Sequence, residues 1–127
     1  MKAILMRLLP ICSVLLWSIH SFGQETNRKK ILGTWAFSKI EFFRSNEDSL
    51  NIINNAKGMI VIFSEDKVTV KNKFDSTRTR TSGYTISPDG STLTHNGGTA
   101  TIANLTDEEL VLNIATEGVI EHFKKVH

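Results

Sequence analysis

Apolar and polar side chains alternate with a period of two through most of the chain after residue 31. Successive side chains of a β-strand point to opposite faces of a sheet, so this period indicates strands with one buried face. The clearest run is LVLNI, from Leu110 to Ile114, in which large aliphatic residues recur at every second position. The predicted strands are Thr34–Phe43, Met59–Ser64, Lys67–Phe74, Thr79–Ser87, Thr92–His95, Thr99–Leu105, Glu109–Ala115 and Val119–Val126.

Short turn sequences separate most of these runs. SPDG, from Ser87 to Gly90, has the proline and glycine positions of a type I turn. HNGG, from His95 to Gly98, contains the Asn-Gly pair that tight hairpins favour. Connections this short join antiparallel neighbours in chain order, and the sequence therefore predicts a meander.

The segment from Arg44 to Gly58 is the exception, because it is too long for a tight turn. Asn46 can cap a helix, Leu50 and Ile53 fall on one helical face, and Gly58 can end the helix. The four asparagines weaken a helix, so a short helix and an ordered loop are both compatible with this segment. In either form it is expected to cover one mouth of the barrel that these strands would form.

The first strand changes phase along its length. Trp35 and Phe37 fall on one face, whereas Ile40 and Phe42 fall on the other. A bulge near Ser38–Lys39 would return both pairs to the same face. A sheet with one apolar face must bury it, and closing the sheet on itself also removes its exposed edges. We therefore predict an all-β fold, an eight-stranded antiparallel up-and-down β-barrel with a short helix or ordered loop after the first strand.

Small barrels can enclose one ligand or be filled by their own side chains, and the sequence leaves both states open. If the barrel admits a small apolar ligand, the inward side chains should contact it. Tyr84 is of special interest because a buried phenol needs a polar partner. The predicted ligand contacts are Phe37, Phe63, Val70, Tyr84, Ile86, Leu112 and Phe123.

Residues 1–23 have the three parts of a secretory signal peptide: the basic residues Lys2 and Arg7, an apolar run, and small residues before a cleavage site at Gln24. The apolar run is shorter than the ~20 residues that span a bilayer. We therefore expect an exported protein, periplasmic or extracellular, with no stable membrane anchor after cleavage. Residues 24–30 are expected to form a flexible N-terminal lead-in, and residues 31–127 a single domain.

Cleavage also changes the charge and the cysteine content of the chain. It removes two of the 15 basic residues, which leaves 13 basic and 13 acidic residues and a formal charge of zero. This balance does not favour a nucleic-acid partner. The single cysteine, Cys12, lies in the leader, so the mature chain has neither a disulfide nor a cysteine-based metal site.

Five motifs resemble the small bacterial lipocalin-like domains of the calycin superfamily, over about residues 31–126. They are Gly33-x-Trp35, the F-x-x-D-x-V pattern from Phe63 to Val68, GYTISPDGSTL, TATIANLTDEELVLNI and the terminal EHFKKV. The resemblance implies that Gly33 lets the strand bend at the closed end of the barrel. It also implies that Trp35 plugs the base beneath a basic side chain of the last strand. That side chain would be Lys125, or Lys124 if the register is shifted.

The chain departs from one branch of that superfamily at the last strand. Intracellular fatty-acid binders hold a carboxylate there with an arginine and a tyrosine, whereas this chain has Glu121 and Phe123 in the corresponding run. Fatty-acid anions are therefore not the expected ligands.

Two functions from different classes follow. The first is an exported binding module for a small apolar ligand, and the alternative is an envelope protein-interaction or inhibitor module with a side-chain-filled barrel. Residues 24–30 and the basic run Asp75–Gly83 are the candidate protein contacts for the alternative. Catalysis is not expected, since His95 and His122 have no partner at nucleophile or metal spacing. We accordingly assign no catalytic residue, no metal site and no cofactor.

Overall fold

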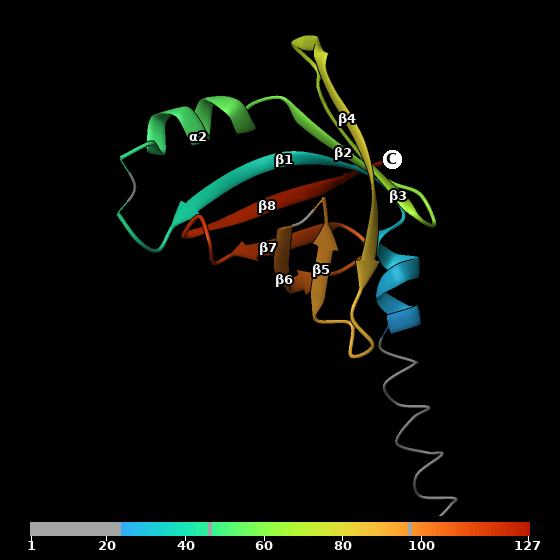
Figure 1. The fold of residues 1–127 in the computed structure, drawn as a ribbon. Coiled ribbons are helices and arrows are strands. Elements are labelled where there is room, and N and C mark those ends of the chain that lie inside the picture. Colours follow the sequence, from blue (N-terminus) through green and yellow to red (C-terminus); the bar gives the residue numbers. More distant parts are fainter. Residues whose placement is uncertain (1–23, 46, 97) are drawn as a thin grey trace, which may run out of the picture.

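The eight predicted strands form and close into a barrel in the computed structural model, which describes residues 24–45, 47–96 and 98–127 (Figure 1). The predicted signal peptide lies outside the described residues. Every strand pairs antiparallel with its neighbour in the chain, and β8 closes the barrel against β1. The strands are β1 (Gly33–Phe42), β2 (Met59–Phe63), β3 (Lys67–Asn72), β4 (Asp75–Ile86), β5 (Thr92–His95), β6 (Gly98–Leu105), β7 (Glu109–Ile114) and β8 (Val119–Val126). The predicted fold class is confirmed.

The predicted bulge in β1 is also confirmed. The register between β1 and β8 shifts between Phe37 and Lys39. The opposed pairs on the inner face are Trp35 with Lys125, Phe37 with Phe123, Ile40 with Glu121, and Phe42 with Val119. Because of the extra residue, the apolar side chains of both halves of the strand point into the same barrel interior. A strand that wraps around a small barrel requires such a bend.

The β3–β4 hairpin extends further than the sequence predicts. β4 begins at Asp75, which lies opposite Asn72, whereas the alternation indicates a strand only from Thr79. Its first residues are polar and exposed, so they give no alternation that a sequence reading could detect. Within the described residues, only Tyr84–Ile86 of β4 pair with β5, and the rest of the hairpin projects away from the barrel (Figure 1).

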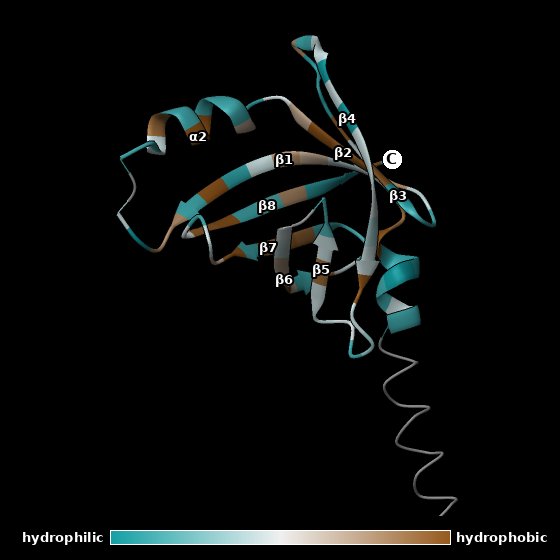
Figure 2. Cartoon of the chain, viewed as in Figure 1, coloured by the Kyte–Doolittle hydropathy of each residue, from teal (hydrophilic) through white to brown (hydrophobic). Residues whose placement is uncertain are grey.

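The core of the barrel is formed by inward side chains from all of its walls. Trp35, Leu93, Leu110 and Val119 are fully buried, and Phe63 and Phe123 are nearly so. Figure 2 shows hydrophobic and hydrophilic residues in alternating bands along β1 and β8. Burial of these apolar side chains stabilises the barrel, which has no disulfide to assist it.

The segment after β1 forms a helix, α2 (Ser49–Ala56). Ala56 is its buried residue and Ile52 is partly buried, whereas Leu50 is 74% exposed. The Asp48 side chain makes no capping hydrogen bond to the helix. The helix therefore rests on the barrel through the face that carries Ile52 and Ala56, and Leu50 points away from it.

Residues 24–31 are helical, so the expected flexible lead-in is wrong for this segment. Gln24 Nε2 donates to the Ile86 carbonyl at 2.7 Å, and Asn27 Nδ2 donates to the Gly90 carbonyl at 2.6 Å. Ile31 at the end of the helix is fully buried. These contacts join residues more than 60 positions apart, which a local reading of a polar terminus could not foresee. Figure 1 shows this helix and α2 on opposite sides of the barrel. In the part of the chain that the structure describes, neither helix has the length and apolar character needed to cross a membrane.

Candidate ligand-binding cavity

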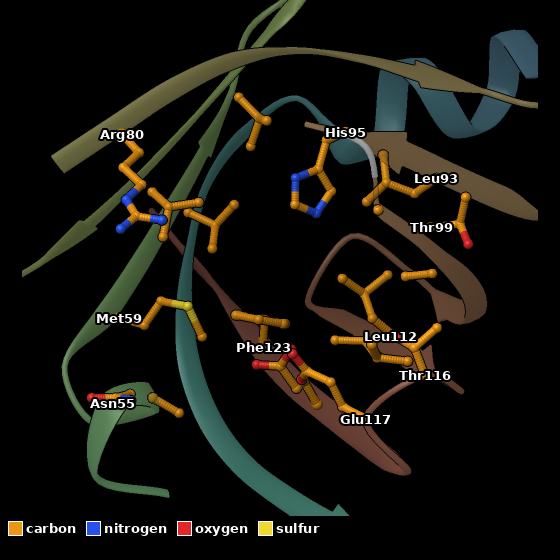
Figure 3. Close-up of a pocket in the computed structure, with 18 of the residues that line it drawn as sticks. Asn55, Met59, Arg80, Leu93, His95, Thr99, Leu112, Thr116, Glu117 and Phe123 are labelled. Atoms are coloured by element: carbon orange, nitrogen blue, oxygen red, sulfur yellow. The ribbon is translucent and has the colours of Figure 1, made fainter. Parts of the chain in front are cut away.

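A cavity of about 560 Å³ opens into the interior of the barrel (Figure 3). Much of its wall is apolar, and a smaller set of polar side chains lines the rest. The apolar lining includes Val61, Phe63, Val68, Leu93, Leu112 and Phe123. The polar lining includes Arg80, His95, Thr99, Thr116, Glu117 and Glu121. An apolar wall with a few polar groups is the usual construction of a small-molecule site.

Trp35 closes one end of the barrel. Its side chain is fully buried, and its indole Nε1 donates to the Ile31 carbonyl at 2.8 Å. Lys125 Nζ lies 4.6 Å from the centroid of the indole ring and donates to the Leu32 carbonyl. Lys125 rather than Lys124 thus lies against Trp35, which is the arrangement that the unshifted register implied.

Gly33 makes room for this contact. Its φ is +116°, a conformation that side chains rarely adopt, and a Cβ built on it would lie 2.7 Å from Lys125 Nζ. Gly33 and Trp35 therefore act together, because the missing side chain of Gly33 leaves room for the lysine that covers Trp35.

The other end of the cavity is bordered by α2 and the loops beside it. Ile52, Asn55 and Ala56 of α2 contribute to the lining. Arg78 Nη2 on the projecting hairpin donates to Asn55 Oδ1 at 3.2 Å, which connects that hairpin to α2. Arg44 Nη2 donates to the Ala115 and Thr116 carbonyls, at 2.7 Å and 2.9 Å, and fixes the loop after β1 to the β7–β8 turn.

Four of the seven predicted ligand contacts lie on the cavity wall, and three do not. Phe63, Val70, Leu112 and Phe123 line it. The other three, Phe37, Tyr84 and Ile86, are absent from its lining and support it from behind.

Each of these three side chains has a partner within the protein. The ring of Phe37 packs edge-on against Phe123, with 6.2 Å between their centroids. The Tyr84 phenol donates to the Ser64 carbonyl at 2.5 Å, so its proton already has an acceptor within the protein. Ile86 is buried in the core, where its carbonyl accepts from Gln24.

Glu121 is a cavity residue that the sequence analysis did not select. It lies on the inner face of β8, opposite Ile40 on β1 and Leu112 on β7. Burial, together with the nearby charge of Glu117, raises the pKa of the Glu121 carboxyl to about 7. The signal was present in the sequence, because Glu121 alternates with Phe123 and Lys125, which were both assigned inward.

The charged side chains of the lining come from different walls. Figure 3 shows Arg80 and His95 on one side of the cavity and Glu117 on the opposite side. Arg80 belongs to the basic run Asp75–Gly83 and His95 to the HNGG turn, and neither lies in an apolar alternation. Their place on the lining depends on how β4 and β5 meet, which the local sequence does not reveal.

The described residues contain no group of three or more histidine, cysteine, aspartate or glutamate side chains placed to hold a metal ion. His122 faces away from the cavity, where its ring nitrogens lie 3.3 Å from Glu41 and 3.5 Å from Glu109. The cavity is suited to holding a molecule. Among the described residues that line it, no nucleophile is paired with a base.

The barrel is similar to the crystal structure of a lipocalin-like protein from Bacteroides uniformis ATCC 8492, with a TM-score of 0.54 and 13% sequence identity over 76% of this chain and 99% of that chain. The chain has a lipocalin-like fold. The resemblance inferred from Gly33-x-Trp35 and the meander is thereby confirmed at the level of the fold. No protein-family model and no curated protein sequence matches the chain.

The two ends of the cavity in this lipocalin-like barrel differ. One end is sealed by Trp35 and Lys125, and the other is bordered by α2 and the β7–β8 turn. A molecule inside the barrel would therefore have its entrance at the end that carries Asn55, Thr116 and Glu117.

Proposed function

We propose that the protein is an exported carrier that binds one small, mainly apolar molecule in the cavity of its lipocalin-like barrel. The cavity itself is the observation that supports this function over a filled core. Its volume of about 560 Å³ lies within the range of roughly 300–1,000 Å³ found for small-molecule sites.

The composition of the wall supports an apolar ligand body. Phe63, Val68, Leu93 and Phe123 present hydrocarbon to the space. Burying about 200 Å² of apolar ligand surface contributes roughly 5 kcal/mol, from which the cost of ordering the ligand must be subtracted. This carrier function requires no cofactor and no reaction.

A neutral fluorescent probe, N-phenyl-1-naphthylamine, tests the function directly. Its emission should rise on mixing with the wild-type protein, because the dye enters an apolar space. Val70→Trp should abolish the rise by filling the cavity. Thr69→Trp is the matched control, since Thr69 belongs to the same strand and its hydroxyl bonds Thr81 on the exposed surface. Equal binding by both variants, or no binding by the wild type, would reject the carrier function.

Export is part of the same proposal and rests on the sequence of residues 1–23. Cleavage before Gln24 would leave the described helix as the mature N-terminus. Amino-terminal analysis of protein recovered from the periplasm or the medium is expected to find a chain beginning at Gln24, in part as pyroglutamate. Recovery of the uncleaved chain in the cytoplasm would contradict it.

The projecting β3–β4 hairpin favours a second candidate, an envelope protein-interaction module. Asp75–Gly83 has no β5 partner among the described residues, so one edge of β4 is available to an added strand. The inhibitor form has less support, because residues 24–31 pack on the barrel as a helix. Pull-down from an envelope extract with wild-type protein and Thr79→Pro, which blocks strand addition, tests this candidate. Equal capture by both would reject the β4 edge as the contact.

A further inference from the structure

Glu121 is placed where a ligand inside the barrel would meet it. The residue lines the cavity from the inner face of β8. Its cross-strand neighbours, Ile40 and Leu112, are both apolar, and the next inward residue on β8 is Phe123. A carboxyl in such surroundings loses much of its hydration.

The protein supplies little to offset that loss. Among the residues that the structure describes, no side chain or backbone group forms a hydrogen bond or ion pair with the Glu121 carboxyl. A carboxyl of this kind either keeps its proton or acquires a cationic partner. Burial raises the pKa of Glu121 to about 7, which agrees with a carboxyl that lacks such a partner.

We propose that Glu121 binds the positively charged amino group of the ligand, which makes the ligand an amine with an apolar body. The inference rests on the proposed carrier function and specifies its ligand class. An ammonium group offers several N–H donors together with the opposite charge, so it satisfies both needs of a desolvated carboxylate. Phe123 and Phe63 would then enclose the apolar body, because both line the same cavity.

The other charged groups of the lining agree with a cation at this wall. Glu117 lies close enough for its charge to raise the pKa of Glu121. Arg80 and His95 lie on the opposite side (Figure 3). Arg80 is exposed, so water can solvate its charge without a ligand, and its presence does not require an anionic one.

Three ligands with the same eight-carbon body and different head groups test the inference: octylamine, 1-octanol and octanoate. Calorimetric titration near pH 8, where the amine is protonated and the acid ionised, compares them on protein expressed from the full-length sequence. The wild type is expected to bind octylamine about tenfold more tightly than 1-octanol, because a hydrogen-bonded charge pair replaces a neutral contact. Octanoate is expected to bind most weakly.

Glu121→Gln should abolish the preference for octylamine over 1-octanol. Glu121→Leu provides a second test, with 1-octanol bound at least as tightly as by the wild type. Glu65→Gln is the control, because Glu65 lies in the exposed β2–β3 turn and its loss should preserve the preference.

The outcomes separate this inference from the function on which it rests. Equal affinity of the wild type for the amine and the alcohol would overturn the inference and leave the carrier in place. A preference that survives in Glu121→Gln would overturn it too. Tightest binding of octanoate would also overturn the inference, because the charged head group of the ligand would then lie on the Arg80 side of the cavity. Failure of all three compounds to bind would reject the carrier function itself, and with it the amine.

Discussion

Lys125 lies above the face of Trp35, with 4.6 Å between its Nζ and the centroid of the ring. The two residues face each other across the β1–β8 pairing that closes the barrel. The Trp35 indole N–H also donates to the Ile31 carbonyl, and the lysine donates to the neighbouring Leu32 carbonyl. This pair therefore joins the first strand, the last strand and the end of the N-terminal helix at the base of the cavity.

Replacing Trp35 with alanine should be strongly destabilising. The side chain is fully buried, and its removal leaves a cavity and an Ile31 carbonyl without its hydrogen-bond donor. We expect a loss of about 3–5 kcal/mol in the free energy of unfolding, measured by urea denaturation. An unchanged urea midpoint would show that Trp35 does not support the base.

Gly33→Ala should also destabilise the barrel, although it adds only one methyl group. Alanine at a φ of +116° is strained, and its Cβ would lie 2.7 Å from Lys125 Nζ. We expect a loss of about 1–3 kcal/mol in a thermal or urea titration.

Gly83→Ala is the matched control for that substitution. Gly83 also lies in a strand, but the nearest atom to a Cβ there is the Asp66 carbonyl oxygen at 3.8 Å. Its stability should remain within about 0.5 kcal/mol of the wild type. Equal effects of the two substitutions would mean that Gly33 has no special role beside the lysine.

Lys125→Met tests the charge above the indole ring while it retains most of the packing. We expect a loss of about 1–2 kcal/mol, because the variant lacks both the cation–π contact and the hydrogen bond to Leu32. Lys124→Met removes an exposed charge from the adjacent position and should change stability little. A larger loss for the Lys124 variant would contradict the assigned register.

Glu121 should make stability depend on pH between about 4.5 and 7. Its pKa is near 4.5 in the unfolded chain and about 7 in the barrel, so the folded protein retains the proton over this interval. Stability contributed by the protonated form is complete below pH 4.5 and is lost as the pH rises to 7. The loss should amount to about 1–3 kcal/mol in the ligand-free protein.

Glu121→Gln isolates this effect. Between pH 5 and pH 8 the urea midpoint of the wild type should fall further than that of the variant, because glutamine does not ionise. His95, Arg80 and Glu117 face the same cavity and are common to both proteins. Identical pH profiles would contradict the raised pKa of Glu121.

The alternation of residues was sufficient to predict the strands, their order and the bulge at Ser38–Lys39. Those features depend on local periodicity and on the need to bury one face, both of which the sequence displays. The start of β4 and the helix at residues 24–31 could not be predicted in this way. Each is polar and depends on a partner elsewhere in the chain, such as Gly90 for Asn27.

The base of the barrel was easier to predict than the cavity. Gly33, Trp35 and Lys125 form contacts determined by β1–β8 pairing, and a motif identifies them. The cavity wall depends on how far each inward side chain reaches, and so Tyr84 lies behind it with its hydroxyl bonded to Ser64. Glu121 was overlooked because a charged residue on an inward face conflicts with the apolar pattern used to select the wall.

Native mass spectrometry of the protein shows directly whether the barrel carries a small molecule. The protein would be expressed from the full-length sequence in its own host and purified without denaturation or organic solvent. We expect a reproducible added mass of one small organic molecule, which is lost on organic extraction and which contains a basic nitrogen. The bare mass of the polypeptide in every preparation would contradict it.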